Sequence, residues 1–559
     1  MLKYQKTISI RNIKASEGKG TRPGMISIKN LSKKKLYYIA AGAILLCCLV
    51  TRLWRLDTLP SGIHFDEAGM AYDAWCLSQY GVDRYLISWP VYLNNFGGGQ
   101  SVLYAYLCAG LFRLFGYSIW LVRLPAVLFS LLTVLYGMKI ARKLYPESYF
   151  PALATGVLLT ICPYLVLIGR LGLDCFLTLG ASTVFLYYFI CAIDSGKYRY
   201  YVIAGFIGGL LLYTYILTYV ILPVFLLLAL IYVIRWKRFS LSHWTAMAIP
   251  MGVLSIPLIL TQLVNIFDLE EIHLGIFTCI RLISYRTSEF KGFQLQFLKD
   301  LIYDIFIYGD FEYCSIPDIP TLYYTTIPLF VIGLLRSFCN FFLSLKNRKT
   351  DYRDFVFTWF LIVFFLFCTV SPNGYRICGI YYCVIMIAVE GLLCVLGLCR
   401  NRLRGRASLI LPSAVSALVT CIYLVCFVRF GIYYYLGDYT RDYYPLNHFH
   451  ITVTEAVEFI RGHPQYGPKE TQLAEPPIHF ALSTLDSPYD LLLLNPQELY
   501  VLDYFHCSCL GEIEKDCNYI VRDIYAEYAD KLRAAGFTEI NYGNYSLFYY
   551  EGSSENTAR

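Results

Sequence analysis

The sequence predicts an all-α polytopic membrane protein with about eleven transmembrane helices and a small extracytoplasmic α/β domain at its C-terminus. Three observations lead to this fold class. Of the 559 residues, 57% are hydrophobic and 16% are charged, whereas soluble domains carry about 25% charged residues. Apolar stretches long enough to cross roughly 30 Å of hydrocarbon recur along most of the chain. The last part of the chain is polar and mixes helix and strand patterns.

A strongly basic tail precedes the first apolar span. Residues 1–35 contain a single acid, Glu17, and end in Lys33, Lys34 and Lys35. The span that follows lacks the small-x-small pattern of a signal-peptidase site. We therefore expect a retained anchor with the tail in the cytoplasm.

The hydropathy pattern then predicts about eleven spans. In order they are 36–53, 119–141, 149–168, 173–193, 201–214, 215–234, 243–266, 321–345, 355–370, 376–399 and 408–430. Residues 201–234 must hold two short helices, which we expect to turn near Tyr213, Thr214 and Tyr215.

Basic residues cluster in alternate loops between these spans. The clusters are Lys139, Arg142 and Lys143; Lys197 and Arg199; Arg235, Lys237 and Arg238; Lys346, Arg348, Lys349 and Arg353; and Arg400, Arg402, Arg404 and Arg406. Cytoplasmic loops carry the excess of Lys and Arg, and all five clusters are cytoplasmic if the N-terminus is. The net charge of +7 therefore reflects topology and not a nucleic-acid-binding face.

Three long segments then fall on the extracytoplasmic side. They are a first loop at 54–118, an acid-rich loop at 267–320, and the C-terminal region. The chain is thus expected to consist of a basic tail (1–35), a transmembrane domain (36–430) and a C-terminal domain (431–559).

The C-terminal region predicts a small α/β domain. We expect a helix at Thr454–Arg461 capped by Thr452 or Thr454, and a helix at Tyr525–Ala535 that ends at Gly536. The expected strands are Asp490–Leu494, Tyr519–Arg522 and Tyr545–Tyr550. Cys507, Cys509 and Cys517 leave a disulfide open in this region. The other cysteines lie mostly in apolar spans, and the lack of a Cys-x-x-Cys pair argues against a zinc ribbon.

Two adjacent acids, Asp66 and Glu67, lie a few residues beyond the first span. Carboxylates at the edge of a bilayer cost solvation energy unless a site uses them, and such a carboxylate can act as a general base. The alternative is that the pair caps a helix beginning near Ala68. Asn95 and Gln100 flank three consecutive glycines further along the loop. This stretch suits a polar ligand, and it equally suits a flexible turn.

Four further charges lie at the outer ends of spans. Arg170 and Asp174 share a very short outer turn, where they either form an ion pair or add a charge pair above the cavity of Asp66. Arg123 and Arg376 begin the second and tenth spans. Each can reach lipid headgroups, and together they suit a phosphate-bearing lipid because guanidinium binds phosphate bidentately.

Three other polar residues are assigned structural roles. Glu390 is a lone acid inside the tenth span, toward the cytoplasmic half, and we favour a partner within the bundle for it. His64 and Asp73 are expected to be ordinary polar residues of the first loop.

These residues together resemble the GT-C glycosyltransferases, in particular the bacterial branch similar to protein O-mannosyltransferases and lipid A aminoarabinose transferases. The resemblance covers about residues 36–400 and is most specific over 54–145. It rests on Phe65-Asp66-Glu67, on the glycine-rich stretch before a helix, and on Val122-Arg123-Leu124-Pro125 at the start of the next span.

The resemblance implies a role for each candidate. Asp66 is the catalytic base and Glu67 supports it, while Arg123 and Arg376 meet the donor phosphate. Arg170 and Asp174 resemble the charged turn of the family, although Arg-x-x-x-Asp is one residue shorter than in the eukaryotic mannosyltransferases. The chain lacks their large β-trefoil insert, which favours a bacterial plasma membrane and an acceptor other than a protein.

The implied activity is transfer of a hexosyl or pentosyl group from a polyprenyl-phosphate donor to an acceptor hydroxyl, with inversion, on the extracytoplasmic face. The implied partners are the lipid-linked donor, a glycan, lipid or protein acceptor, and membrane lipids. No cofactor is expected, since no Asp-x-Asp pattern accompanies the acids; a divalent metal on Asp66 and Glu67 is the less favoured version. Asn95 and Gln100 are expected near the donor or acceptor.

The alternative is a multi-span transporter or lipid flippase. Eleven spans and the internal Glu390 allow it. Transporters usually show internal repeats and charges near the midplane, whereas the polar signals here gather at the outer face. The sequence therefore favours an interfacial enzyme.

Overall fold

The computed structural model describes most of the helical part of the chain and much of the C-terminal region. The described residues are 28–95, 98–282, 291–306, 314–316, 319–347, 350–402, 407–437, 449–450, 453–463, 470–473, 477–485, 487–489, 492–493, 500–502, 505–543 and 545–550. They fall into two compact units, Met1–Ala43 and Ile44–Arg559. The described part of the first unit is the beginning of helix α1.

Every predicted span coincides with a helix or with two consecutive helices. These are α1 (Ile28–Leu53), α4 (Ile119–Leu144), α5 and α6 (Phe150–Ile161, Pro163–Ile168), η1 and α7 (Asp174–Phe176, Leu177–Ser195), α8 (Tyr198–Leu212), α9 (Thr218–Arg235), α10 (Leu241–Ile266), α12 (Thr326–Asn347), α13 (Arg353–Leu366), η4 and α14 (Arg376–Ile380, Tyr381–Arg402) and α15 (Ala407–Gly431). Among the described residues, 8 helices are long and apolar enough to cross a membrane, and α5 and α8 are shorter apolar helices. The polytopic all-α prediction is confirmed.

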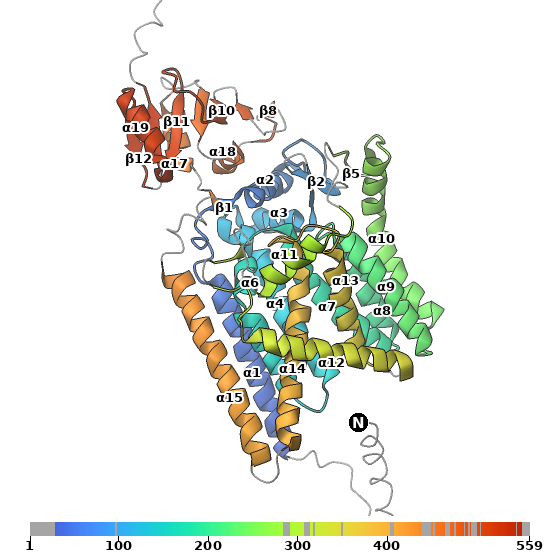
Figure 1. The fold of residues 1–559 in the computed structure, drawn as a ribbon. Coiled ribbons are helices and arrows are strands. Elements are labelled where there is room, and N and C mark those ends of the chain that lie inside the picture. The colour runs from blue at the N-terminus through green and yellow to red at the C-terminus, as the bar shows by residue number, and fades with distance from the viewer. Residues whose placement is uncertain are drawn as a thin grey trace, which may run out of the picture. The chain divides into compact units, whose positions relative to one another are not determined.

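The least certain pair of spans is also confirmed. Helix α8 ends at Leu212 and α9 begins at Thr218, so the chain turns at Tyr213–Tyr215 as expected. Helix α8 packs against both α9 and α10, and the three green helices lie side by side in Figure 1.

Small residues allow the closest helix crossing in the bundle. A Cβ on Gly333 of α12 would lie 1.8 Å from the carbonyl oxygen of Ile387, and one on Gly391 of α14 would lie 1.9 Å from that of Leu329. The two backbones therefore touch, which is how membrane helices gain packing energy when lipid is as apolar as their side chains.

The predicted first loop is itself folded. It contains β1 (Ile63–His64), α2 (Phe65–Tyr80), a hairpin of β2 (Tyr92–Asn95) and β3 (Gly98–Ser101), and α3 (Leu103–Phe115). Helix α2 packs on α3, and β3 and α3 contact η1. Figure 1 shows α2, α3 and β2 close together. The later outer segment contains β4 (Ile272–Leu274), β5 (Phe277–Cys279) and α11 (Leu295–Phe306).

The C-terminal region holds a mixed sheet in the strand order β12-β13-β11-β7-β10-β9-β8. The strands are β7 (Glu470–Leu473), β8 (Leu492–Leu493), β9 (Tyr500–Leu502), β10 (Phe505–Cys509), β11 (Asn518–Arg522), β12 (Thr538–Asn541) and β13 (Tyr545–Tyr549), and the helices are α17 (Thr454–Gly462), α18 (Pro477–Thr484) and α19 (Ala526–Ala534). Strands β7, β10 and β11 run parallel to one another, and the other pairings are antiparallel. The α/β prediction is confirmed.

Individual predictions for this region fared differently. Both helices and the three strands that were predicted are present, and β7, β9, β10 and β12 were missed. The expected threonine cap on α17 is wrong, because its N-cap is Val453 and no side chain caps it. Thr452 and the side chains of Cys507 and Cys509 lie outside the described residues. The disulfide left open among the three cysteines is therefore not tested.

The C-terminal region packs on the first loop. Strand β6 (Phe449–His450) pairs antiparallel with β1, and α18 packs on α2. Ile478 and Leu482 of α18 belong to the same buried cluster as Ile63 and Ala71 of the loop. The last part of the chain therefore supports the helix that follows β1.

Candidate active site

The two adjacent acids occupy the first turn of α2 and have different surroundings. His64 is the N-cap residue: its Nδ1 accepts from the backbone N–H of Asp66 (3.2 Å), and its own N–H donates to Glu67 (3.3 Å). This is a reciprocal capping box with histidine as the cap. Glu67 therefore caps the helix, as one alternative predicted, while the carboxylate of Asp66 takes no part in the box.

Glu67 also forms a buried ion pair with Arg123. The Nε of Arg123 lies 3.1 Å from Oε1 of Glu67, and neither side chain is exposed. The same Oε1 accepts from the backbone N–H of Gly172 at 2.7 Å. Glu67 thus joins α2, α4 and the turn before η1, and its oxygens are occupied by protein donors.

Arg123 of α4 anchors the beginning of the first loop. Besides Glu67 it donates to the backbone oxygens of Leu56 (2.9 Å), Pro60 (3.1 Å) and Gly62 (2.5 Å). These contacts engage all five guanidinium N–H groups. All of these acceptors belong to the protein, and the side chain fixes the loop that carries Asp66.

Arg170 anchors the end of α1 and the beginning of the same loop. It is fully buried, and its Nε donates to the hydroxyl of Tyr434 (3.1 Å). Its terminal nitrogens donate to the backbone oxygens of Thr51, Arg52, Trp54, Arg55 and Leu59. A guanidinium at the C-terminus of α1 meets carbonyls that lack helical partners and the negative end of the helix dipole.

Of the two alternatives for Arg170 and Asp174, the ion pair is not seen between these described residues, and Asp174 lines the cavity of Asp66. Oδ2 of Asp174 accepts from the backbone N–H of Ser101 (2.9 Å), and its Oδ1 accepts from that of Cys175 (2.8 Å). Asp174 therefore ties η1 to the end of strand β3.

Asp66 lines a small polar pocket at the meeting point of four segments. The cavity has a volume of about 50 Å³ and is lined by Asp66, Tyr92, Asn95, Gly99, Gln100, Leu173, Asp174, Cys175, Tyr215 and Tyr375. Four predicted site residues are thus brought together: Asp66, Asn95, Gln100 and Asp174. Glu67, Arg123 and Arg170 do not line it.

The surroundings of Asp66 suit contact with a ligand. Its side chain is 33% exposed, and its Oδ1 accepts from Nδ2 of Asn95 at 3.0 Å. Gln100 is 5% exposed, and its Oε1 has no hydrogen-bond partner among the described residues. Asp66 and Gln100 thus both line the cavity, and a carboxylate and an amide oxygen can both accept from hydroxyl groups.

The glycine-rich stretch forms the β2–β3 hairpin. Asn95 pairs with Gly98, and Asn94 with Gly99. A Cβ on Gly99 would lie 2.0 Å from the ring of Tyr92, so this glycine makes room for a pocket-lining ring and not directly for a ligand. Gly97 lies outside the described residues.

Arg376 begins η4 beside the pocket. Its guanidinium lies 5.6 Å from the ring centroid of Tyr375, and Tyr375 lines the cavity. Its Nη1 donates to the backbone oxygen of Ser371 at 3.4 Å, and the side chain is half-buried. Of the predicted arginines, Arg376 is the one adjacent to the pocket wall.

Sequence reasoning missed the ion pair beneath the pocket. Asp73 and Arg84 are buried, with Nε of Arg84 3.4 Å from Oδ1 of Asp73. Asp73 had been assigned an ordinary polar role, although it follows Asp66 by two helical turns and shares its face of α2. Arg52, a buried donor to the backbone of Thr160, was also missed.

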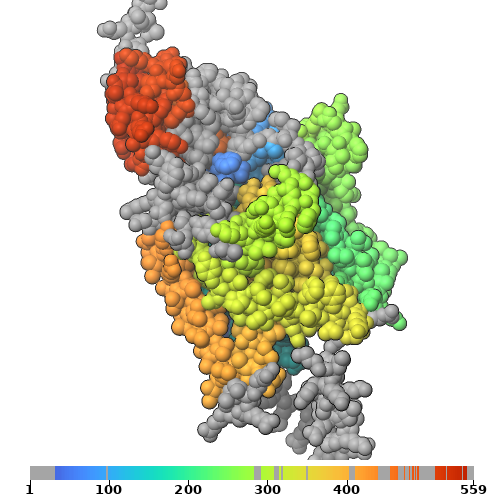
Figure 2. Space-filling view, in the orientation of Figure 1, coloured from blue at the N-terminus to red at the C-terminus, as the bar shows by residue number. Residues whose placement is uncertain are grey.

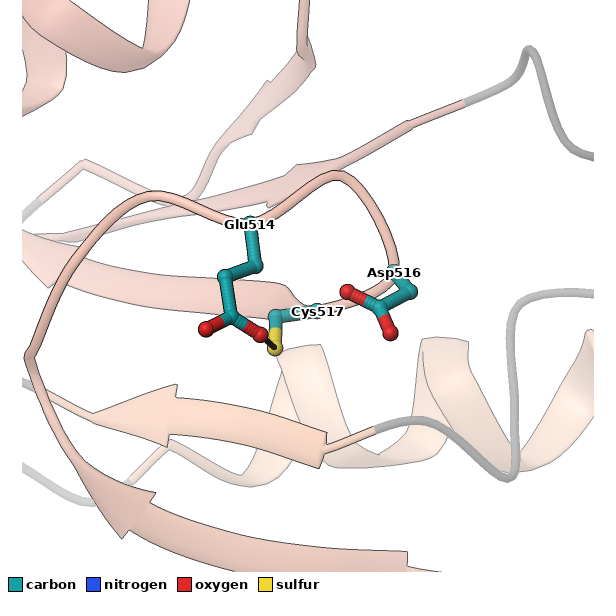
Figure 3. Close-up of side chains that lie close together, drawn as sticks. All are labelled: Glu514, Asp516 and Cys517. Carbon is teal, nitrogen blue, oxygen red and sulfur yellow. Dashed lines mark hydrogen bonds between the residues drawn. The ribbon is translucent and has the colours of Figure 1, made fainter.

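The polar groups elsewhere are remote from this pocket. Glu390 has the predicted partner in the bundle, Arg353, at 3.2 Å. Among the described residues one group has its potential metal-ligand atoms within 4.8 Å of one another: Glu514, Asp516 and Cys517, before β11 (Figure 3). None of these three lines the cavity of Asp66.

Comparison with protein families supports the resemblance seen in the sequence. Residues 100–263 match the family model described as dolichyl-phosphate-mannose-protein mannosyltransferase. The match begins at Gln100 and includes Arg123, Arg170 and Asp174, and it confirms the predicted similarity to GT-C transferases. No curated protein matches the chain.

Several solved structures are similar in outline. ArnT from Cupriavidus metallidurans in the apo state has 13% identity and a TM-score of 0.49, over 92% of this chain and 98% of that chain. The same protein bound to undecaprenyl phosphate has 12% identity and a TM-score of 0.47, over the same shares of the two chains. The apo oligosaccharyltransferase of Archaeoglobus fulgidus has 12% identity and a TM-score of 0.46, over 71% of this chain and 56% of that chain.

Proposed function

We propose that this chain is a membrane glycosyltransferase that moves a sugar from a polyprenyl-phosphate donor to an acceptor hydroxyl, with Asp66 as the general base. The observation that carries the proposal is the position of Asp66. It is a partly exposed carboxylate in a polar pocket, in a chain whose residues 100–263 match a family named for a lipid-phosphate sugar donor. A transferase of this kind needs a base at the acceptor hydroxyl and positive charge at the lipid phosphate.

An apolar groove supports the lipid-linked donor. It has a volume of about 490 Å³ and is lined by hydrophobic side chains of α11, α12, α13, η4 and α14. In Figure 2, α11 and α12 occupy the centre of the visible face, drawn in green to yellow. Ile380 at the end of η4 lines the groove, and Arg376 begins the same short helix. A polyprenyl chain in the groove would bring its phosphate toward Arg376.

The chemistry follows from this assignment. Asp66 takes the proton of the acceptor hydroxyl, whose oxygen attacks the anomeric carbon from the side opposite the phosphate and inverts the centre. The bond from that carbon to the phosphate oxygen breaks, and the lipid phosphate leaves as an anion. It therefore needs no proton donor, and the guanidinium of Arg376 stabilises the developing charge.

The remaining pocket residues would hold the sugar or the acceptor. Gln100 has a buried amide oxygen, and Asp174 and Tyr375 also line the cavity. The cavity holds a few water molecules at its present volume, so we expect the surrounding loop segments to move apart when a sugar enters. Glu67, Arg123 and Arg170 support the loop from outside the cavity.

The charge distribution supports an extracytoplasmic site. Alternate basic loops favour a cytoplasmic N-terminal tail, which leaves the first loop on the other side of a bacterial plasma membrane. The acceptor is a glycan, a lipid or a protein that presents a hydroxyl group there. The described pocket lies among folded loop segments. A transporter or flippase would instead be expected to have its charged site near the membrane midplane.

Substitution of Asp66 tests the base. We expect Asp66→Asn to be inserted normally and to lose transfer by a factor of about 10² to 10⁴, because a carboxamide cannot accept the proton. Membranes are incubated with candidate polyprenyl-phosphate sugars and acceptors, and mass spectrometry identifies the product. Asp57→Asn is the matched control, since Asp57 is an exposed acid of the same loop.

Three results would contradict the proposal. Unimpaired transfer by Asp66→Asn would exclude it as the base. Retention of anomeric configuration in the product, read by NMR, would exclude single-step inversion. Solute or lipid movement by a parent protein without transferase activity would favour the rival class.

A further inference from the structure

A line of polar contacts runs from the buried interior of the first loop to Asp66. It begins on one face of α2, where Asp66, Gly69 and Asp73 are spaced three and four residues apart and therefore lie above one another. Asp73 is fully buried and Arg84 is 4% exposed. The backbone N–H of Arg84 donates to Oδ1 of Asp73 at 3.1 Å, and its Nε lies 3.4 Å from the same oxygen.

Gly69 allows Arg84 to lie against this face. A Cβ on Gly69 would be 2.9 Å from Nη1 of Arg84, 3.0 Å from Nη2, and 2.6 Å from Oδ1 of Asn95. Real Cβ atoms do not approach other heavy atoms so closely. The glycine therefore makes the space in which the guanidinium meets the side chain of Asn95.

Arg84 determines which way the Asn95 carboxamide points. Its Nη2 donates to Oδ1 of Asn95 through a short hydrogen bond and to the backbone oxygen of Asn94 at 3.5 Å. The other end of the carboxamide, Nδ2, donates to Oδ1 of Asp66 at 3.0 Å. A guanidinium only donates and an ionised carboxylate only accepts. The two neighbours therefore permit a single orientation of the amide, with its oxygen toward Arg84 and its nitrogen toward Asp66.

We infer that Arg84, anchored by Asp73, is a positioning residue that acts through Asn95 to hold the carboxylate of Asp66 in the orientation needed for proton transfer. This inference rests on the proposed function. A base whose orientation is fixed by a hydrogen bond loses less freedom when the acceptor hydroxyl arrives, and small misplacements of a reacting group reduce rates strongly. The neutral Asn95 transmits the orientation without placing a second charge beside the base.

The inference also gives the glycine and the asparagine separate tasks. Asn95 was expected to contact the donor or acceptor, and here it contacts the base. Gly69 has no polar group to offer, yet any side chain there would displace the guanidinium. Asp73 therefore fixes Arg84, and Arg84 orients the carboxamide of Asn95. Asn95 in turn holds the base, Asp66.

Conservative replacement of Arg84 tests the inference. Lysine keeps a positive charge beside Asp73, but an ammonium lacks the planar fork that reaches both Asp73 and Asn95. We expect Arg84→Lys to lower kcat by roughly ten- to a hundredfold while the KM for the donor and the melting temperature in detergent stay unchanged. Arg113→Lys is the matched control, because Arg113 is an exposed arginine at the end of α3.

A double-mutant cycle tests whether Arg84 acts through Asn95. We expect Arg84→Lys combined with Asn95→Ala to be no slower than Asn95→Ala alone, because the double variant has no carboxamide for residue 84 to orient. Additive losses in kcat would overturn the inference, and so would an unchanged kcat in Arg84→Lys or a loss confined to the donor KM.

The failure of this inference is distinct from failure of the proposed function. A parent protein that transfers sugar and depends on Asp66, with normal kcat in Arg84→Lys, overturns only the positioning role. A parent protein without transferase activity, or one indifferent to Asp66→Asn, overturns both. Restoration of kcat in Arg84→Ala by added guanidinium ion would support the inference, because a merely folding role is not repaired by a small cation during assay.

Discussion

Two adjacent acids with different neighbours illustrate what a single residue contributes here. Glu67 is fully buried and accepts from His64, Gly172 and Arg123, whereas Asp66 is partly exposed and lines the pocket. The helix turns by about 100° per residue, so neighbours in sequence face different surroundings. The dipeptide therefore divides into a buried carboxylate that supports the fold and a partly exposed one that lines the pocket.

Substitution of Glu67 is predicted to affect stability. Glu67→Gln leaves the buried guanidinium of Arg123 without a counter-charge, and breaking a buried pair from one side costs about 3–5 kcal/mol. We expect a lower melting temperature in detergent, followed by loss of activity as the protein unfolds. Asp66→Asn is the matched control and is expected to melt like the parent. Equal melting temperatures for all three proteins would contradict the role given to Glu67.

A second residue of the loop predicts a pH dependence of stability. Burial raises the pKa of Asp83 to about 6, against the hydrogen bonds that its Oδ1 accepts from the backbone of Tyr85 and Ile87. Its Oδ2 is buried and has no hydrogen-bond partner among the described residues, which suits a protonated carboxyl. The charge of Glu271 adds to the shift.

The sign of the effect follows from proton binding. The native state holds this proton more tightly than the unfolded chain, in which the pKa is about 3.9. The stabilisation from Asp83 is therefore complete below pH 4 or so and is lost as the pH rises through about 6. We expect melting temperatures in detergent to fall over this range in the parent, and to fall less in Asp83→Asn. Identical pH profiles would contradict the assignment.

At the scale of elements, the crossing of α12 and α14 depends on two glycines, Gly333 and Gly391, which lack side chains. A methyl group on Gly391 would overlap the backbone oxygen of Leu329, so the helices would have to separate. We expect Gly391→Ala to destabilise the protein by about 1–3 kcal/mol. The melting temperature of the detergent-solubilised protein measures the effect.

The same helix offers the control. A Cβ on Gly397 meets nothing within 4 Å, so Gly397→Ala should be neutral or slightly stabilising, since alanine favours helix over glycine. Equal loss of stability in the two variants would contradict the role given to the crossing.

The elements were largely predictable from the sequence, and the reason is local. Hydropathy over about twenty residues depends on the segment itself, so each predicted span contains a helix, including the short pair that turns near Tyr213. The short strands β7, β9, β10 and β12 were missed because a strand of three to five residues needs its neighbours in the sheet to be recognised. The absent threonine cap of α17 is a similar case, since capping depends on how the preceding chain enters the helix.

The site was predictable only in part. Asp66, Asn95, Gln100 and Asp174 line one cavity, because alternate loops of a membrane protein lie on the same side of the bilayer. The roles of Arg123 and Arg170 were not foreseeable, because the carbonyl oxygens that they bind come from a loop whose path the sequence does not reveal. The contribution of Arg84 likewise depends on Gly69, although the common face of Asp66, Gly69 and Asp73 was a signal that could have been used.

At the scale of the whole molecule, the C-terminal region is predicted to be required for activity. Helix α18 packs on α2, and β6 pairs with β1, whose second residue is the capping residue His64. We expect a chain ending at Gly437 to enter the membrane and to lose at least tenfold in transfer, because α2 loses both supports. Membrane fractionation and the transferase assay measure insertion and activity separately. Removal of residues 551–559 alone is the control, and full activity of the longer truncation would contradict the prediction.

The pairing of β1 with β6 also sets an order of events during synthesis. Strand β1 leaves the ribosome early, and its partner β6 follows only after every predicted span has been translated. Chains are made from the N-terminus, and their domains fold as they emerge. The helix that carries Asp66 therefore reaches its final setting only after the last predicted span has been translated. We therefore expect a nascent chain that still lacks β6 to have no transferase activity.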